Sequence, residues 1–186
     1  MKKHTFGLVA AVLALNLAGA APSFAQDSLT GKVGFGFQGL VAGNVINGAS
    51  VRGWTANKFG WEGNLLYSYA KISAGGENYK GDLWGLEAKG LYALVERENS
   101  KMYVGAKFAY MPYEVKVDGH GKVFDGHLIE PGVLAGAEFC IPNLPEVGIN
   151  FEVGYNYIKS DNTVVGHNLD AKYHGINAGV GIHYYF

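Results

Sequence analysis

Apolar and polar positions alternate with a period of two along most of this chain. Eight segments show the alternation: 31–40, 49–56, 61–71, 83–94, 102–110, 129–141, 149–159 and 173–186. In the seventh segment, Phe151 and Tyr155 share one face, whereas Glu152 lies on the other. Because successive side chains of a strand point to opposite faces, each segment predicts a strand with one apolar and one polar face. A helical spacing would scatter the same carboxylates among the aromatic rings.

The connections between these segments fall into two alternating sets. Short turns at 56–60, 96–101 and 142–148 alternate with longer loops at 42–48, 73–81, 118–126 and 160–172. Short turns at one end and longer loops at the other are typical of an outer-membrane barrel. We therefore predict an all-β fold, an eight-stranded antiparallel up-and-down transmembrane β-barrel with both termini at the short-turn end. The apolar positions change phase at Pro112, which we interpret as a bulge or a strand end.

The size of the side chains predicts which face of the barrel meets lipid. Eight strands enclose a space that is barely wide enough for side chains. Large rings such as Trp61, Trp84 and Phe151 would overfill that space, whereas the glycines and compact polar groups of the other face fit it. We therefore expect the rings to face lipid, as in membrane barrels. The barrel must also close, because an open sheet edge in hydrocarbon leaves backbone groups without partners.

Charged residues gather on the predicted inner face. They are Lys32, Arg52, Glu62, Glu87, Lys89, Lys107, Glu130, Glu138 and Glu152. We expect these groups to pair as a structural salt-bridge plug, since an unpaired buried charge is strongly destabilising. The alternatives are a path for protons or ions and an active site built on paired carboxylates.

The start of the chain predicts export. Lys2 and Lys3 precede an apolar run that ends in small residues around Ala25, the layout of a secretory signal peptide. We predict a cleaved signal peptide at 1–25 and a single outer-membrane barrel domain at 26–186. Cleavage would leave 13 Lys and Arg against 16 Asp and Glu, a net charge of −3 that disfavours binding to nucleic acid. The single cysteine, Cys140, forms no internal disulfide.

The terminal sequence GVGIHYYF, taken with the signal peptide and the eight strands, resembles the small outer-membrane β-barrel family that includes OmpX, Ail and the membrane domain of OmpA. In that family the barrel-assembly machinery reads a terminal phenylalanine with apolar residues at alternate positions before it. Val180, Ile182, Tyr184 and Phe186 match this assembly signal. The resemblance implies a monomer in the cell outer membrane, in contact with membrane lipid and lipopolysaccharide. It implies a structural or surface-interaction role, such as membrane integrity or adhesion to a surface ligand or host protein through the outer loops.

Two other functions stay open: a narrow pore for water, protons or small ions, and an enzyme that modifies lipid A. The His-x-Ser pair of the lipid A deacylases is missing, since Ile158 stands two positions before Ser160. Metal candidates at the outer rim are His120, His127, His167 and His174. Imidazoles ligate zinc or copper, but these spacings match no metal motif. We predict no catalytic residue, no cofactor and no enzymatic activity.

Overall fold

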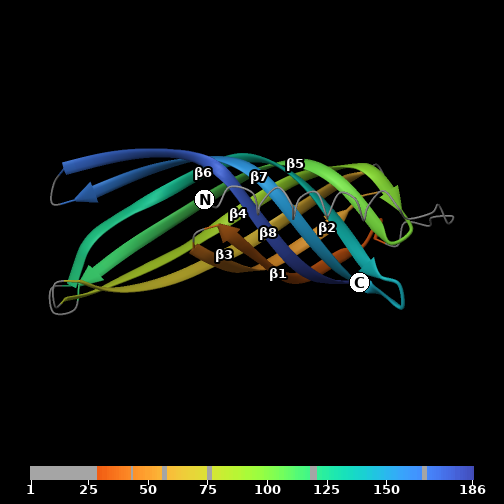
Figure 1. Ribbon diagram of the computed structural model, residues 1–186, viewed down its shortest axis with the longest axis horizontal. Coiled ribbons are helices and arrows are strands. Elements are labelled where there is room, and N and C mark those ends of the chain that lie inside the picture. Colours follow the sequence, from red (N-terminus) through yellow and green to blue (C-terminus); the bar gives the residue numbers. More distant parts are fainter. Residues whose placement is uncertain (1–28, 43, 56–57, 75–76, 118–120, 165–166) are drawn as a thin grey trace, which may run out of the picture.

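Eight antiparallel strands form a closed barrel in the computed structural model, which describes residues 29–186 except 43, 56–57, 75–76, 118–120 and 165–166 (Figure 1). The strands are β1 (Val33–Ala42), β2 (Asn44–Trp54), β3 (Phe59–Ala74), β4 (Glu77–Arg97), β5 (Ser100–Val117), β6 (Gly121–Ile141), β7 (Leu144–Val164) and β8 (His167–Tyr185). Each strand pairs with the next along the chain, and β8 pairs with β1. The predicted fold class is confirmed. No helix in the described part of the chain is long and apolar enough to cross a membrane. The predicted signal peptide lies outside the described residues.

The barrel is much longer on one side than on the other. β4, β6 and β7 each contain 21 residues, whereas a membrane crossing takes about 9–11 residues of tilted strand. The β3–β4, β5–β6 and β7–β8 hairpins project at the left of Figure 1, and the β1–β2 hairpin ends well short of them. The expected long loops at 42–48, 73–81, 118–126 and 160–172 are therefore wrong, because the strands continue through most of these residues.

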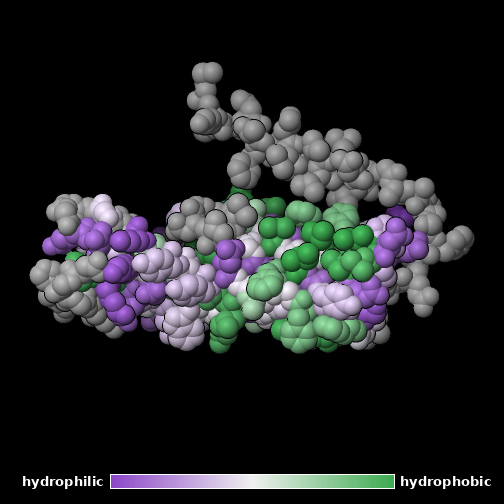
Figure 2. All heavy atoms as spheres, turned by 90° about the horizontal axis from the view of Figure 1, so that it is seen from below, coloured by the Kyte–Doolittle hydropathy of each residue, from purple (hydrophilic) through white to green (hydrophobic). Residues whose placement is uncertain are grey.

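The outer surface carries an apolar band around the barrel at the short-turn side. Figure 2 shows hydrophobic residues gathered right of centre, with hydrophilic residues at both ends. Large rings of the alternating pattern are exposed on this band, among them Trp61, Tyr67, Trp84, Phe108 and Tyr184. A soluble barrel would bury such rings, so this inverted surface is that of a membrane-spanning barrel.

Beyond the apolar band the polarity of the strands reverses. We call this part the projecting sheet; it consists of the described residues within 68–83, 111–128 and 158–174 of β3 to β8. On its inner side, Met111 is buried in a cluster with Leu66 and Ala109, and Leu83 and Leu128 pack against that cluster. Lys116 is exposed, whereas its neighbour Val117 is buried. The projecting sheet therefore has the apolar-in, polar-out arrangement of a sheet in water.

This reversal explains the change of phase at Pro112, and the expected bulge or strand end there is wrong. β5 runs through Pro112 and keeps its register with β6, since Met111 pairs with Leu128 and Pro112 with His127. The register shift lies further on, between Val115 and Lys116. The apolar positions change face because the strand passes from lipid to water, while its backbone continues unchanged.

The segment before β1 closes the short-turn end of the barrel. Leu29 is buried in a cluster with Trp54, Tyr103 and Tyr185. Gly31 adopts a positive φ of 80°, which glycine tolerates, and its N–H donates to the carbonyl of Trp54 at 2.8 Å. The turn brings Leu29 back across the mouth of the barrel.

Candidate functional site

Arg52 on β2 is the centre of a charged network inside the barrel. Its side chain has no exposed surface. Nη2 donates to Glu152 Oε1 on β7 at 2.7 Å and to the Tyr103 hydroxyl on β5 at 2.8 Å. Nε lies 2.8 Å from Glu62 Oε2, an ion pair without the angle of a hydrogen bond. The guanidinium thus joins strands on opposite walls of the lumen.

Two lysines continue the network toward the projecting sheet. Lys89 Nζ lies 2.6 Å from Glu152 and 2.7 Å from Glu62. Lys107 Nζ lies 2.7 Å from Glu130 and 3.1 Å from Glu87. All these side chains are buried, so their attraction is screened much less than at a surface.

Glu138 occupies a different environment near the short-turn end. Trp54 Nε1 donates to its Oε2 at 2.8 Å, and the Tyr185 hydroxyl donates to its Oε1 at 2.5 Å. Arg52 Nη1 is further away, at 3.5 Å. Each oxygen of the Glu138 carboxylate therefore accepts a hydrogen bond from a neutral donor. Such hydrogen bonds stabilise the charged form of a carboxylate.

Neutral amides occupy the remaining positions around the carboxylates. Asn64 Nδ2 donates to Glu62 at 2.7 Å and to Glu87 at 2.9 Å. Asn156 donates to Glu130. Gln38 Nε2 donates to Glu152 at 3.3 Å. Taken with the cations, these contacts link polar side chains from several strands across the lumen.

The network contains more acids than bases. Five carboxylates (Glu62, Glu87, Glu130, Glu138 and Glu152) meet three cations (Arg52, Lys89 and Lys107). Each cation contacts at least two carboxylates, which spreads the positive charge over the excess of acids. Removing one cation would leave buried carboxylates without compensation, which is costly.

One residue of the predicted charge set lies apart from the network. Lys32 precedes β1 and is partly exposed, and no ion pair of Lys32 is among the contacts of the described residues. Its backbone instead accepts a hydrogen bond from Trp54 N at 3.4 Å.

The sequence analysis did not identify several buried partners. Trp54, Tyr103 and Tyr185 face the lumen, although the large rings were expected to face lipid. Lys101 is also buried, lies 3.0 Å from Glu96 and packs 4.8 Å from the Trp54 ring. The signal was present in the alternation: Tyr103 and Lys101 share the phase of Lys107, and Trp54 shares that of Arg52.

Among the described residues, the histidines expected at the outer rim do not come together at one site. His127 Nε2 lies 3.5 Å from Asp161, and His174 Nδ1 lies 2.7 Å from the Tyr155 hydroxyl. His120 lies outside the described residues, and so does the side chain of His167. In the described part of the chain, no group of three potential metal ligands comes together.

Two solved structures share this fold at low sequence identity. One is Neisserial surface protein A, with 20% identity, 83% of this chain and 96% of that chain covered, and a TM-score of 0.54. The other is the N-terminal β-barrel domain of Pseudomonas aeruginosa OprF, with 13% identity, 85% and 99% coverage, and a TM-score of 0.52. No protein-family model matches the sequence, and no curated protein matches it. The chain has the fold of the small eight-stranded outer-membrane β-barrel proteins.

Proposed function

We propose that this protein resides in the outer membrane as a non-enzymatic barrel that holds the projecting sheet outside the cell for contact with a partner. The observation that carries the proposal is the length of the hairpins. About half of β4, β6 and β7 exceeds what a bilayer crossing uses. The first described residues, from Leu29, and the C-terminal Phe186 lie at the short-turn side, which is the periplasmic side in barrels of this kind. The projecting sheet then faces the outside.

Two unpaired strand edges make the projecting sheet suited to binding. β2 pairs with β3 only as far as Tyr67, and β1 pairs with β8 only as far as Gly179. Beyond these residues, β3 pairs only with β4 and β8 only with β7 among the described strands. Unpaired edges accept an extended segment of another chain through main-chain hydrogen bonds. On the β8 edge, the Tyr173 side chain is 65% exposed and provides apolar contact area.

The pore alternative has less support than surface contact. Arg52 and Lys89 each contact Glu152 from strands across the lumen, and their side chains are almost fully buried. An ion would have to break several of these contacts to pass. Planar-bilayer recording tests the pore directly, and mass spectrometry of lipid A from expressing and non-expressing cells tests the enzyme.

Impermeant labelling of intact cells tests the orientation. A Lys116→Cys variant carries its thiol on the projecting sheet, and an Arg97→Cys variant carries it at the short-turn end; both native side chains are exposed. The native Cys140 is buried. We expect an impermeant maleimide to label the first variant in intact cells and the second only after the outer membrane is opened. Labelling of Arg97→Cys alone in intact cells would reverse the orientation and end the proposal.

A pair of tyrosine variants tests binding at the edge. Tyr173→Lys adds a charge to the open edge of β8, whereas Tyr79→Lys adds one to β4, which is paired on both sides. We expect wild-type expression to raise cell adherence to immobilised matrix proteins or cell–cell aggregation. Tyr173→Lys should remove most of that gain and Tyr79→Lys little of it. Adherence and aggregation equal to those of cells without the protein would contradict the proposal.

A further inference from the structure

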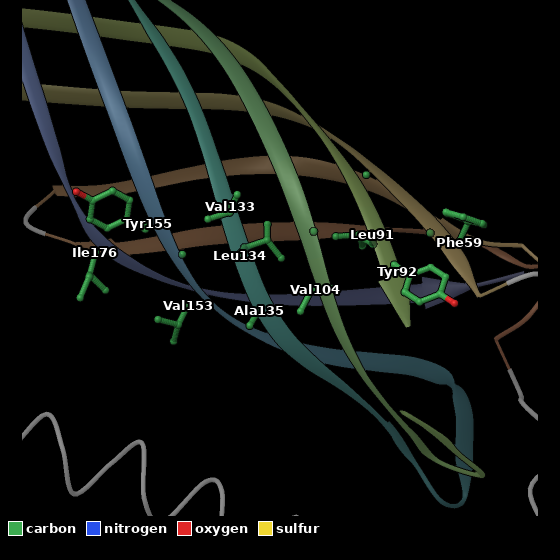
Figure 3. A pocket seen from close by; sticks show the side chains of 14 residues that line it. Phe59, Leu91, Tyr92, Val104, Val133, Leu134, Ala135, Val153, Tyr155 and Ile176 are labelled. Atoms are coloured by element: carbon green, nitrogen blue, oxygen red, sulfur yellow. The ribbon is translucent and has the colours of Figure 1, made fainter. Parts of the chain in front are cut away.

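An apolar groove crosses the lipid-facing surface of the barrel. It has a volume of about 870 Å³ and runs over β3 to β8. Figure 3 shows Phe59 and Tyr92 at one end, Tyr155 and Ile176 at the other, and the small side chains of Val104 and Ala135 between them. Gly90 also lines the groove, and a Cβ at this position would meet no atom within 4 Å. The groove therefore lies where small residues interrupt the exposed rings.

On the outer face of β7 and β8, the residues that pair across the two strands form rows. The type of side chain changes from row to row between the groove and the projecting sheet. Val153 pairs with Ala178, and Tyr155 pairs with Ile176. The following rows are Tyr157 with His174, then Lys159 with Lys172. Successive outward rows are two residues, or about 7 Å, apart along a strand. An apolar floor, an aromatic girdle and a pair of ammonium groups thus follow one another over about 20 Å.

This order matches the parts of a phosphorylated lipid in the outer leaflet. Acyl chains need an apolar groove, the sugar or ester region suits aromatic and imidazole side chains, and phosphate attracts lysine. Lys159 also contacts Asp161 at 2.9 Å, and Asp161 pairs with Asp170 one row further out. The two lysines face each other across the strands in the row nearer the membrane. Asp161 compensates the charge of Lys159 in part, and a phosphate between the two lysines would offset their mutual repulsion.

On the other side of the barrel, an acidic row lies between the aromatic row and the lysine row. On β3 and β4, Tyr67 pairs with Trp84, then Tyr69 with Asp82, and only then Lys71 with Lys80. Asp82 also pairs with Glu114 on β5. An acidic row therefore separates those lysines from the membrane, and it would repel a phosphate. A second groove, of about 560 Å³, lies on that side and includes Gly63.

We infer that the groove and the lysine pair of β7 and β8 form a binding site for the phosphorylated glycolipid lipid A, with an acyl chain in the groove and a phosphate at Lys159 and Lys172. This inference rests on the proposed outer-membrane location. The specificity comes from the order of the rows: cations lie directly outside the aromatic girdle beside the larger groove, whereas an acidic row comes first beside the smaller groove.

Two matched pairs of variants test the site. Lys159→Gln/Lys172→Gln removes the cross-strand lysine pair of β7 and β8, and Lys71→Gln/Lys80→Gln removes the equivalent pair of β3 and β4. Gly90→Leu fills the larger groove, and Gly63→Leu fills the smaller one. A Cβ at either glycine meets no atom within 4 Å, so both substitutions leave the barrel folded. Circular dichroism and gel mobility before and after boiling check the fold of each variant.

The purified barrel in detergent is titrated with bisphosphorylated lipid A, with its dephosphorylated form and with phosphatidylglycerol, and bound lipid is counted by native mass spectrometry. A lysine near an anionic lipid contributes about a fivefold change in affinity, so we expect the β7–β8 double variant to bind lipid A about 25-fold more weakly. Its affinity for dephosphorylated lipid A should stay within about twofold of wild type. Gly90→Leu should weaken binding of both forms, and the β3–β4 and Gly63 variants should change neither.

Equal losses in the control variants, or an unchanged Kd in the β7–β8 double variant, would overturn the site. Phosphatidylglycerol binding as tightly as lipid A would overturn the choice of lipid A. This titration is independent of cell location, which the labelling of Lys116→Cys reports. A failed orientation and a failed lipid site therefore give different results.

Discussion

Replacing Arg52 with methionine tests whether the lumen is held together by charge balance. The guanidinium lies 2.7 Å from Glu152, 2.8 Å from Glu62 and 3.5 Å from Glu138. Without it, Glu62 and Glu152 keep Lys89, whereas Glu138 keeps the neutral donors Trp54 and Tyr185 and loses its ion pair with Arg52. Breaking a buried pair by removing one partner costs about 3–5 kcal/mol. We expect Arg52→Met to lower the free energy of unfolding by that amount.

Reversible urea unfolding in lipid vesicles measures this change, and an exposed ion pair of similar length provides the control. Lys116 Nζ lies 2.8 Å from Glu114, but the two side chains are 53% and 35% exposed. Surface pairs contribute little because water and salt screen them. Lys116→Met should therefore leave the unfolding free energy unchanged, although the distance is nearly the same as that of Arg52 to Glu62.

A second substitution separates charge from packing. Glu138→Gln removes a carboxylate that loses its ion pair with Arg52 in Arg52→Met, while it keeps an acceptor for Trp54 or Tyr185. The double variant Arg52→Met/Glu138→Gln should recover about 1 kcal/mol or more relative to the sum of the single changes, a coupling typical of contacting residues. If the two losses simply add, or if Arg52→Met is as mild as Lys116→Met, the charge-balance explanation is refuted.

Three further predictions follow from the fold. In planar bilayers the wild-type protein should pass no measurable current, because polar contacts cross the lumen at Arg52; steady single-channel steps would disprove this. Gly36→Ala should destabilise the barrel by about 1–3 kcal/mol, since a Cβ there overlaps the carbonyl oxygen of Ile182, whereas Gly63→Ala should have little effect in the same urea assay. Phe186→Ala should lower the yield of barrel in the outer membrane of cells but leave refolding into vesicles intact, because this ring is 71% exposed and contacts only surface rings such as Phe35. Equal loss in cells and in vesicles would assign Phe186 to stability instead of assembly.

The alternation of the sequence predicts the barrel because each strand must show one face to lipid and one to the lumen. The same reasoning suggests the position of Arg52, since an arginine at the lipid face near the midplane costs about 2–4 kcal/mol. It did not single out Trp54, Tyr103 and Tyr185, which face the lumen. The size argument considered only the rings of the apolar face, yet a few rings of the other face fit where glycines leave room: a Cβ at Gly136 would lie 2.6 Å from the Tyr103 ring. The contacts between strands far apart in sequence, such as Arg52 with Glu152, depend on register and height, which alternation does not specify.

The lengths of the strands were misjudged for a physical reason. The predicted strands 83–94 and 102–110 stop where the outward positions cease to be apolar, near Asp82 and Pro112. In the structure the pattern continues with its faces exchanged, and Val117 and Leu83 become the inner apolar positions. Segments that read as polar loops are strands in water. Tracking each face separately, without assuming that the apolar face stays outward, would have extended β4 and β5 past the membrane.

The exchange of faces also bears on how the protein meets a partner. Strands that continue from lipid into water keep their register with their neighbours, and the inner cluster around Met111 holds the projecting sheet together without a partner. Flexible loops would lose conformational entropy on binding, whereas a sheet of this kind is already ordered. The open edges of β3 and β8 are therefore presented at a fixed position relative to the lysine pair of β7 and β8. Lys172 and Tyr173 are neighbours on β8, but their side chains point to opposite faces of the sheet, so a lipid A headgroup on the outer face would leave the inner face of the same edge open to a partner.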